Sequence, residues 1–240
     1  MPQIAPSLLR EALDVLRDQY FREKTLFLKG EQMAEILTGL GARESDLAAI
    51  QRSGDELPSD PTLPFRKSRN ARFHLSPEQR KGHRTEAQSF VLSAEEDFVR
   101  HDSGMVRTFA EIPAEDGRNS VLTSLLVFQE YLTRGLSVSA RPSLDYTTGD
   151  WISTVFHLRT ITWSEILGQP ALEGVHSDGV DHTMTVFLKS HNMTSDSAKT
   201  RVHHNDEQTG KSWDAVDPRF VITEVQHRDS LDTLLVFDHE

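Results

Sequence analysis

The chain has 240 residues, no cysteine, and 26 basic against 37 acidic side chains, so its formal net charge is −11. This charge opposes binding to nucleic-acid phosphates and anionic membrane surfaces, and the lack of cysteine excludes thiolate metal ligands, thiol nucleophiles and disulfides. No apolar run approaches the ~20 residues of a membrane span, and the N-terminus does not have the pattern of a signal peptide. We therefore expect a cytoplasmic protein that binds neither nucleic acid nor membranes.

Helical spacing of apolar residues dominates the start of the chain. A chain of this length commonly forms one domain, so we expect residues 1–240 to fold as a single domain whose first 52 residues are helical. A short strand is possible at 25–28, and the proline-rich stretch 53–64 interrupts regular structure. The helical stripes consist of Leu9, Leu13, Leu16 and Tyr20, and of Met33, Ile36, Leu37 and Leu40.

Residues 65–75, FRKSRNARFHL, concentrate positive charge in an otherwise acidic chain. The basic side chains are Arg66, Lys67, Arg69 and Arg72. Two interpretations stay open. The charges can face solvent along an edge strand, where they discourage aggregation between sheets. Alternatively, they form a site for an anion.

The second half of the chain changes from helical to β-type periodicity. We expect a third helix with Ser120 as its N-cap, and alternation of apolar and polar residues begins at Trp151. In WISTVFHLRTITW one face is mostly apolar, and the other carries His157 and Arg159. Further β-rich runs lie at 182–189, 219–225 and 233–237. Helices followed by many short strands indicate an α+β fold, for which a jelly roll mainly over 65–240, buttressed by N-terminal helices, is the natural candidate.

The sequence EGVHSDGVDHTMTVF carries the strongest chemical signal. His176 and Asp178 are two positions apart, so in an extended backbone both side chains leave the same face, with Cα atoms about 6–7 Å apart. With a second histidine from a distant strand, such a pair forms the facial triad of non-haem iron sites. The alternative is a surface hydrogen bond between a histidine and an aspartate at a strand end. No nucleophile elbow, P-loop, dinucleotide or HExxH motif competes with it.

Five segments of the chain resemble one protein family. They are LFLKGEQMAEIL, DPTLPFRKSRNARF, VFHLRTI, GVHSDG and SLDTLLVFD, and they occur in the order typical of the 2OG-Fe dioxygenases that include bacterial free L-isoleucine hydroxylases. The resemblance covers nearly the whole chain. It implies a double-stranded β-helix (a cupin-like jelly roll) and an enzyme that uses Fe(II), 2-oxoglutarate and O2 to hydroxylate a small substrate, such as a free amino acid or a derivative of one.

The resemblance also suggests roles for four residues outside the GVHSDG segment. Arg159 and His157 belong to a strand similar to a core-lining strand of the family. We expect them to point into the barrel, with Arg159 binding the cosubstrate and His157 the substrate, although an internal ion pair or an outward-facing charge is the alternative. Arg69 and Arg72 lie in a segment similar to the mouth of the active site and are expected to bind a substrate carboxylate.

The resemblance assigns the iron ligands incompletely. His176 and Asp178 match the first two ligands. In the family, the third is a histidine several residues after the LDTLL strand, and a cosubstrate-binding arginine lies further on. His239 is the candidate for the third ligand, although the family pattern places it slightly upstream, and His227 precedes the strand that should deliver it. We expect that the chain is truncated at its C-terminus. A site completed by His239, or a paralogue without catalysis, are the alternatives.

Three functions follow from these alternatives. The favoured one is an Fe(II)- and 2-oxoglutarate-dependent hydroxylase, with weak or no activity in a chain that has only two of three ligands. The second is a catalytically inactive jelly-roll paralogue that acts as a binding or regulatory protein. The third is a metal-dependent hydrolase that uses the same ligands and needs neither O2 nor 2-oxoglutarate.

Overall fold

The computed structural model describes residues 6–76, 81–91, 103–141 and 145–238. Helices dominate the N-terminal part and antiparallel strands the C-terminal part, as the change of periodicity predicts. The helices are α1 (Pro6–Glu23), α2 (Gly30–Gly39), α3 (Glu44–Ser53), α4 (Ala114–Gly117) and α5 (Ser120–Thr133), with a 3-10 turn at Pro218–Phe220. The strands are β1 (Thr25–Leu28), β2 (Arg66–Ser76), β3 (Lys81–Thr85), β4 (Trp151–Thr160), β5 (His182–Val186), β6 (Lys199–His203), β7 (Val221–Gln226) and β8 (Thr233–Phe237).

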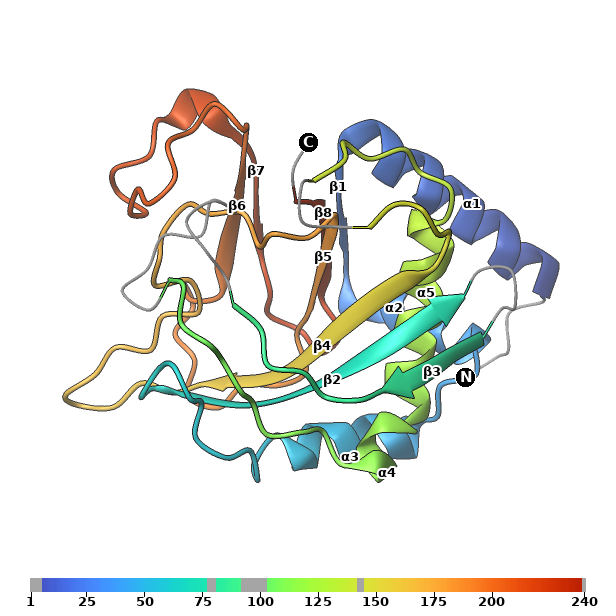
Figure 1. The fold of residues 1–240 in the computed structure, drawn as a ribbon, viewed down its shortest axis with the longest axis horizontal. Helices are drawn as coiled ribbons and strands as arrows, with labels where there is room; N and C mark the ends of the chain where they lie inside the picture. The colour runs from blue at the N-terminus through green and yellow to red at the C-terminus, as the bar shows by residue number, and fades with distance from the viewer. Residues whose placement is uncertain (1–5, 77–80, 92–102, 142–144, 239–240) are drawn as a thin grey trace.

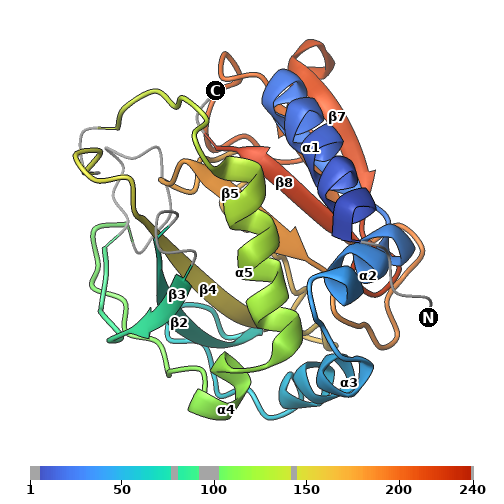
Figure 2. The ribbon, with the colours of Figure 1, turned by 90° about the vertical axis from the view of Figure 1, so that its right-hand side faces the viewer.

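The strands form antiparallel sheets. In one sheet β8 lies between β1 and β5, in a second sheet β2 lies between β3 and β4, and β6 pairs with β7. Figures 1 and 2 show α1, α2 and α5 together on one side of the sheets, and the β6–β7 pair on the opposite side in Figure 1. The result is a mixed helix and strand fold with antiparallel sheets, consistent with a jelly roll.

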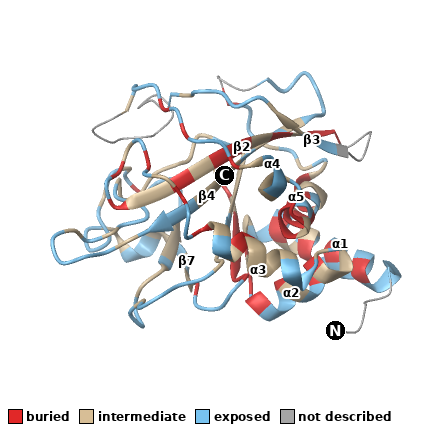
Figure 3. Cartoon of the chain, turned by 90° about the horizontal axis from the view of Figure 1, so that it is seen from below, coloured by how far each residue is buried: buried red, intermediate tan, exposed pale blue. Residues whose placement is uncertain are grey.

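A first apolar cluster joins the helices to the β1–β8–β5 sheet. It includes Tyr20 of α1, Leu37 of α2 and Phe128 of α5, which are fully buried, and Leu235 and Phe237 of β8. The helical stripes of the first fifty residues therefore face this cluster. Figure 3 shows the buried positions along α1 and α5.

A second cluster joins α5 and α3 to the β3–β2–β4 sheet. Leu122 and Leu126 of α5 pack with Ala71 and Phe73 of β2, and Val155 of β4 packs against them. Side chains alternate along a strand, so the odd-numbered residues of β2 and β4 face the helices and the even-numbered residues face away. This assignment decides where the basic side chains of both strands point.

Several sequence-based boundaries differ from the observed ones. Asn119, and not Ser120, is the N-cap of α5, because its side chain accepts hydrogen bonds from the amides of Val121 and Leu122. The expected strand at 182–189 ends at Val186. β6 was not expected at all, because it lies within polar, turn-rich sequence and becomes a strand by pairing with β7. No helix in the part of the chain that the structure describes has the length and apolar character to cross a bilayer.

Candidate metal centre

His176 and Asp178 lie in an irregular segment that leads into β5. Nε2 of His176 is 3.2 Å from Oδ1 of Asp178, so the two side chains converge on one point. The His176 side chain is 20% exposed and that of Asp178 44% exposed, which leaves both groups accessible to an ion from solvent. The structure therefore places an imidazole nitrogen and a carboxylate oxygen side by side, which is the arrangement expected of a ligand pair and also of the alternative, a hydrogen bond between the two side chains.

The main chain fixes the orientation of the His176 ring. Nδ1 lies 2.7 Å from the carbonyl oxygen of Gly174, and because a carbonyl can only accept, Nδ1 carries the hydrogen. Nε2, which faces Asp178, is then the nitrogen that can bind an ion once its own proton is lost. Gly174 has φ +76°, and a Cβ there would lie 2.2 Å from the carbonyl oxygen of Lys211, so only glycine fits.

The carboxylate of Asp178 is held by the strand that follows it. Thr183 in β5 donates a hydrogen bond from Oγ1 to Oδ2 of Asp178, at 2.9 Å. This bond leaves Oδ1 directed at His176. Metal-binding carboxylates and imidazoles commonly have such outer partners, which set their orientation before an ion binds.

The pKa values of the two groups reflect their pairing. Burial lowers the pKa of His176, but its hydrogen bond to Asp178 and the charge of that carboxylate outweigh burial and raise it to about 9. Burial raises the pKa of Asp178, but the hydrogen bond to His176, the charge of that ring and the hydrogen bond from Thr183 together outweigh burial and lower the pKa. Without a metal, the pair is therefore an imidazolium and a carboxylate at neutral pH. A divalent ion would have to displace the Nε2 proton.

His157 and Arg159, which we expected to point into the barrel, lie on the other side of β4. Both occupy odd positions of β4, which face the helices as Val155 does. Nε2 of His157 lies against Gly54 at the end of α3. Arg159 directs Nη1 to Oδ1 of Asp55 at 3.4 Å, and because both side chains are exposed, this pair matches the alternative of an outward-facing charge. The alternation shows that the two faces of β4 differ, but not which one the helices cover.

Arg69 and Arg72 point to opposite sides of β2. Arg69 lies opposite His157 on the helix-facing side, and its Nη1 donates to the carbonyl oxygen of Glu111 at 2.8 Å. Arg72 lies opposite Thr154 on the face that points away from the helices, and its Nη1 donates to Oε1 of Gln88. Of the two arginines, only Arg72 thus shares the side of the sheet that the helices leave open.

The candidate third ligand, His239, lies outside the described residues. His227 is buried, with its ring against Phe27 and Phe187, so it does not belong to the His176–Asp178 pair. Within the described ranges, no group of three or more histidine, aspartate or glutamate side chains is placed to hold a metal ion. The donor set thus fits two of the three protein ligands of an iron site.

Sequence reasoning missed one residue beside the His176–Asp178 pair. Asp238, directly after β8, accepts hydrogen bonds from the backbone amides of Asp178 and Gly179. The signal available in the sequence is an apolar strand, LLVF, that ends on an aspartate. Only the antiparallel pairing of β8 with β5, which sets the end of one strand beside the start of the other, shows its position.

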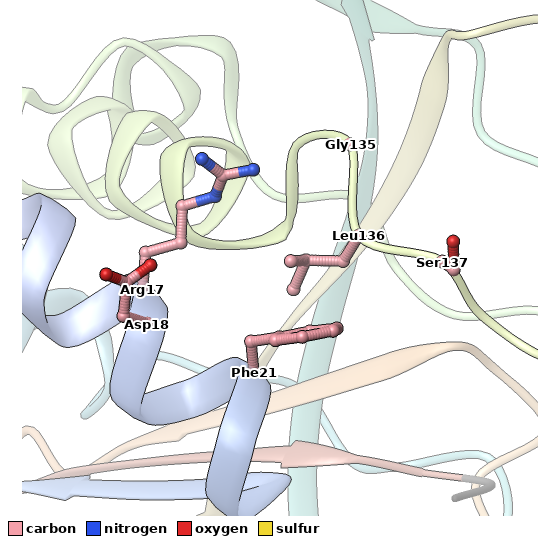
Figure 4. Close-up of a pocket in the computed structure, with 6 residues that line it drawn as sticks. All are labelled: Arg17, Asp18, Phe21, Gly135, Leu136 and Ser137. Atoms are coloured by element: carbon pink, nitrogen blue, oxygen red, sulfur yellow. The ribbon is translucent and has the colours of Figure 1, made fainter.

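The hollow in Figure 4 lies elsewhere on the molecule. It is a shallow pocket of about 280 Å³ between the C-terminal half of α1 and the turn after α5, where Phe21 and Leu136 face each other. Arg17 is bonded from Nη2 to the carbonyl oxygen of Arg134 and forms part of its wall. None of its lining residues belongs to the segment of His176 and Asp178, so it does not extend the metal centre.

Comparison with known proteins places this geometry in a family. A sequence model of the 2OG-Fe dioxygenase family matches residues 51–240. The bifunctional enzyme flvA of Aspergillus flavus is 40% identical over 225 residues, which is 94% of this chain but only 27% of that enzyme. The chain therefore spans about a quarter of the length of this curated relative.

Two solved structures have a similar fold. The Fe(II)/α-ketoglutarate-dependent dioxygenase TqaL superimposes with a TM-score of 0.79 at 38% identity, over 97% of this chain and 78% of its own. A bsmA homologue from Methylobium petroleophilum PM1 superimposes with a TM-score of 0.70 at 17% identity, over 94% of this chain and 81% of its own, and supports the fold alone. The chain belongs to the 2OG-Fe dioxygenase family, whose members are non-haem iron enzymes that use Fe(II), 2-oxoglutarate and O2.

Proposed function

We propose that the chain acts as an Fe(II)- and 2-oxoglutarate-dependent dioxygenase that hydroxylates a small substrate, a free amino acid or a derivative of one. The observation that carries the proposal is the convergence of His176 Nε2 and Asp178 Oδ1 at 3.2 Å, in a chain of this family. A histidine and a carboxylate from neighbouring positions are two of the three ligands of a facial triad, which leaves the remaining positions for cosubstrate and oxygen.

His176 and Asp178 would hold the iron. When bound, Fe(II) with 2-oxoglutarate and O2 supplies the oxidising chemistry: one oxygen atom enters a C–H bond of the substrate, the other enters succinate, and CO2 leaves. The chain's own residues prepare this site. Gly174 keeps the hydrogen of His176 on Nδ1, and Thr183 keeps one carboxylate oxygen of Asp178 occupied, so that Nε2 and Oδ1 face the ion.

The sheets would supply the walls of the site. We infer that they roll into a double-stranded β-helix whose outer side is supported by α1, α2, α3 and α5, because both apolar clusters lie between these helices and the sheets. The face of β2 and β4 that points away from the helices would then line the interior. Phe156 lies on this face and packs edge-to-face with Phe109 at 5.2 Å, which gives an apolar wall that excludes water.

Arg72 is the candidate for binding an anionic group of the substrate. It lies on the same face as Phe156, and a guanidinium can bind a carboxylate through two parallel hydrogen bonds. A free amino acid has such a carboxylate. Arg69 and the helix-facing Arg159 and His157 are less suited to this role, because they point to the other side of the sheet.

One observation favours a second function. Among the described residues, no third histidine, aspartate or glutamate is placed to hold an ion together with His176 and Asp178. A jelly-roll protein that binds a small molecule without oxidising it would keep the fold and need no complete iron site. The metal-dependent hydrolase has no comparable support.

Incorporation of labelled oxygen distinguishes these functions. The protein is incubated with Fe(II), 2-oxoglutarate, isotopically labelled O2 and a panel of free amino acids, and products are analysed by mass spectrometry. We expect one labelled oxygen in a product and an equal amount of succinate, both lost in Asp178→Ala and kept in Asp229→Asn, which changes an exposed aspartate. Turnover without O2 would indicate the hydrolase, and substrate binding without turnover the non-catalytic protein.

A further inference from the structure

We infer that Asp238 is a positioning residue of the proposed metal centre: its carboxylate fixes the main chain of the turn that carries both candidate ligands. The inference rests on the proposed function, and it concerns a residue that touches neither the ion nor the substrate. Its basis is a set of hydrogen bonds that join the end of β8 to the turn before β5.

Both oxygens of the Asp238 carboxylate bind this turn. Oδ1 accepts a hydrogen bond from the amide of Asp178 at 2.9 Å. Oδ2 accepts one from the amide of Gly179 at 3.0 Å and one from Oγ of Ser177 at 2.6 Å. The amide of Val180 is also within 3.4 Å of Oδ2. One side chain thus holds four consecutive residues of the metal-binding segment.

The hydrogen bonds of Asp238 lie on the side of the segment opposite the two candidate ligands. In the sequence His-Ser-Asp, the outer side chains point to the proposed ion and the middle one points the other way, where Oγ of Ser177 meets Asp238. The amide bonded to Oδ1 belongs to Asp178 itself. The position of the ligand's Cα, and hence the direction of its carboxylate, therefore depends directly on Asp238.

Asp238 is itself fixed by the sheet. It follows Phe237, which is buried in the apolar cluster, and its amide donates to the carbonyl oxygen of Asp181 at 3.0 Å. β8 is the middle strand of its sheet, bonded to β1 on one side and to β5 on the other. The metal-binding turn is irregular, whereas the residue that holds it is attached to one of the most constrained strands of the fold.

A buried arginine, Arg141, lies beside the carboxylate of Asp238 and balances its negative charge. The Arg141 side chain is 5% exposed, and its Nη1 lies 3.6 Å from Oδ2 of Asp238. The same nitrogen is 3.4 Å from Oγ of Ser177 and 3.4 Å from the carbonyl oxygen of Val180. The cation offsets the repulsion between the carboxylates of Asp238 and Asp178, which lie on either side of one backbone segment.

Co(II) titration of Asp238→Asn tests the inference. The amide keeps the size of the side chain but replaces one acceptor oxygen with an NH2 group, which cannot accept the bonds of Gly179 and Ser177. We expect Co(II) affinity to fall by about 10–100-fold, as for other outer partners of metal ligands. We also expect the visible Co(II) spectrum, which reports coordination geometry, to change. Asp229→Asn removes the same charge from an exposed loop and should match the unsubstituted protein in both measurements.

The possible results separate the inference from the proposed function. An affinity within twofold of the unsubstituted protein and an unchanged Co(II) spectrum in Asp238→Asn would overturn the positioning role. If that variant does not fold, Asp238→Glu keeps the charge but displaces the carboxylate by one methylene group from the amides of Asp178 and Gly179, and an unchanged spectrum and affinity in it would overturn the role equally. If His176→Ala and Asp178→Ala bind Co(II) as tightly as the unsubstituted protein, the proposed metal site fails, whatever Asp238 does.

Discussion

Three aspartates with little exposed side-chain surface hold turns of this chain by accepting backbone hydrogen bonds. They are Asp60, Asp232 and Asp238, whose side chains are 0%, 0% and 10% exposed. Asp60 accepts hydrogen bonds from the amides of Thr62 and Leu63. Asp232 accepts from the amides of Gly30, Arg228 and Asp229. Asp238 accepts from the amides of Asp178 and Gly179. Losing such a carboxylate leaves buried donors without a partner, which is more costly than losing a surface contact.

Asp60 gives a prediction about acid stability. Burial raises the pKa of Asp60, but hydrogen bonds led by that from Arg66 outweigh it and lower the pKa to about 2, against 3.8 for the free group. Because the folded pKa is the lower one, this stabilisation is present above pH 4 and is lost as the pH falls through 2. We expect Asp60→Asn to lower the free energy of unfolding by about 2 kcal/mol at pH 7.

Urea unfolding of Asp60→Asn and of the unsubstituted protein, followed between pH 7 and pH 2, measures this difference. It should shrink as the pH falls below 4. A difference that stays constant over this range would show that the Asp60–Arg66 pair is not the cause.

Residue-scale prediction from the sequence succeeded where the geometry is local. The spacing of two predicted that His176 and Asp178 leave the same side of the chain, and they do converge, although their segment is irregular and not a strand. The role of Asp238 could not be read in the same way, because it lies 60 residues from Asp178 and reaches it only through the pairing of β8 with β5. Local spacing therefore identified the candidate ligands, and tertiary pairing identified what holds them.

At the scale of elements, α5 is the link between the two apolar clusters. Phe128 and Leu132 face the cluster shared with α1, and Leu122 and Leu126 face the one shared with β2. Its start is fixed by Asn119, whose Oδ1 accepts from the amide of Val121 at 2.9 Å, while its Nδ2 donates to the carbonyl oxygen of Asp46 at 2.7 Å. The N-cap thus also joins α5 to α3.

Removing this N-cap should destabilise the whole fold. We expect Asn119→Ala to lower the free energy of unfolding by about 1–2 kcal/mol, because two amides of the first turn lose their acceptor. Ser120→Ala should cost less, because it leaves the cap in place and removes the hydrogen bonds of Ser120 Oγ with the amide of Arg43 and the carboxylate of Asp46, which are near the surface. Thermal unfolding of both variants checks the order. A larger loss in Ser120→Ala would support Ser120 as the cap.

Prediction of helices and strands succeeded for strongly periodic segments. It failed where pairing with another strand decides whether a segment is a strand. The stripes of the first fifty residues predicted α1 and α2 because each repeats over more than two turns. β6 was missed because its five residues become a strand only beside β7. The alternation in β4 was read correctly, but periodicity cannot say which face the helices cover, and this is why His157 and Arg159 were assigned to the wrong side.

At the scale of the whole molecule, the candidate metal segment is held between two separate parts of the chain. Asp238 holds it on one side, at the end of β8. On the other side, Val175 is bonded to the loop between β6 and β7. Its amide donates to the carbonyl oxygen of Lys211 at 2.9 Å, and its carbonyl oxygen accepts from the amide of Gly210 at 2.7 Å. The position of the ligand pair therefore depends on the assembled sheets, and an ion that binds the pair should stabilise the folded chain.

The most direct test of the central claim is anaerobic titration of the protein with Fe(II) by calorimetry. The claim is that His176 and Asp178 bind the ion together. It predicts saturable binding to the unsubstituted protein, with affinity at least tenfold lower in both His176→Ala and Asp178→Ala, and unchanged affinity in His191→Ala, which alters an exposed histidine. Equal Fe(II) affinity in all four proteins would contradict the claim.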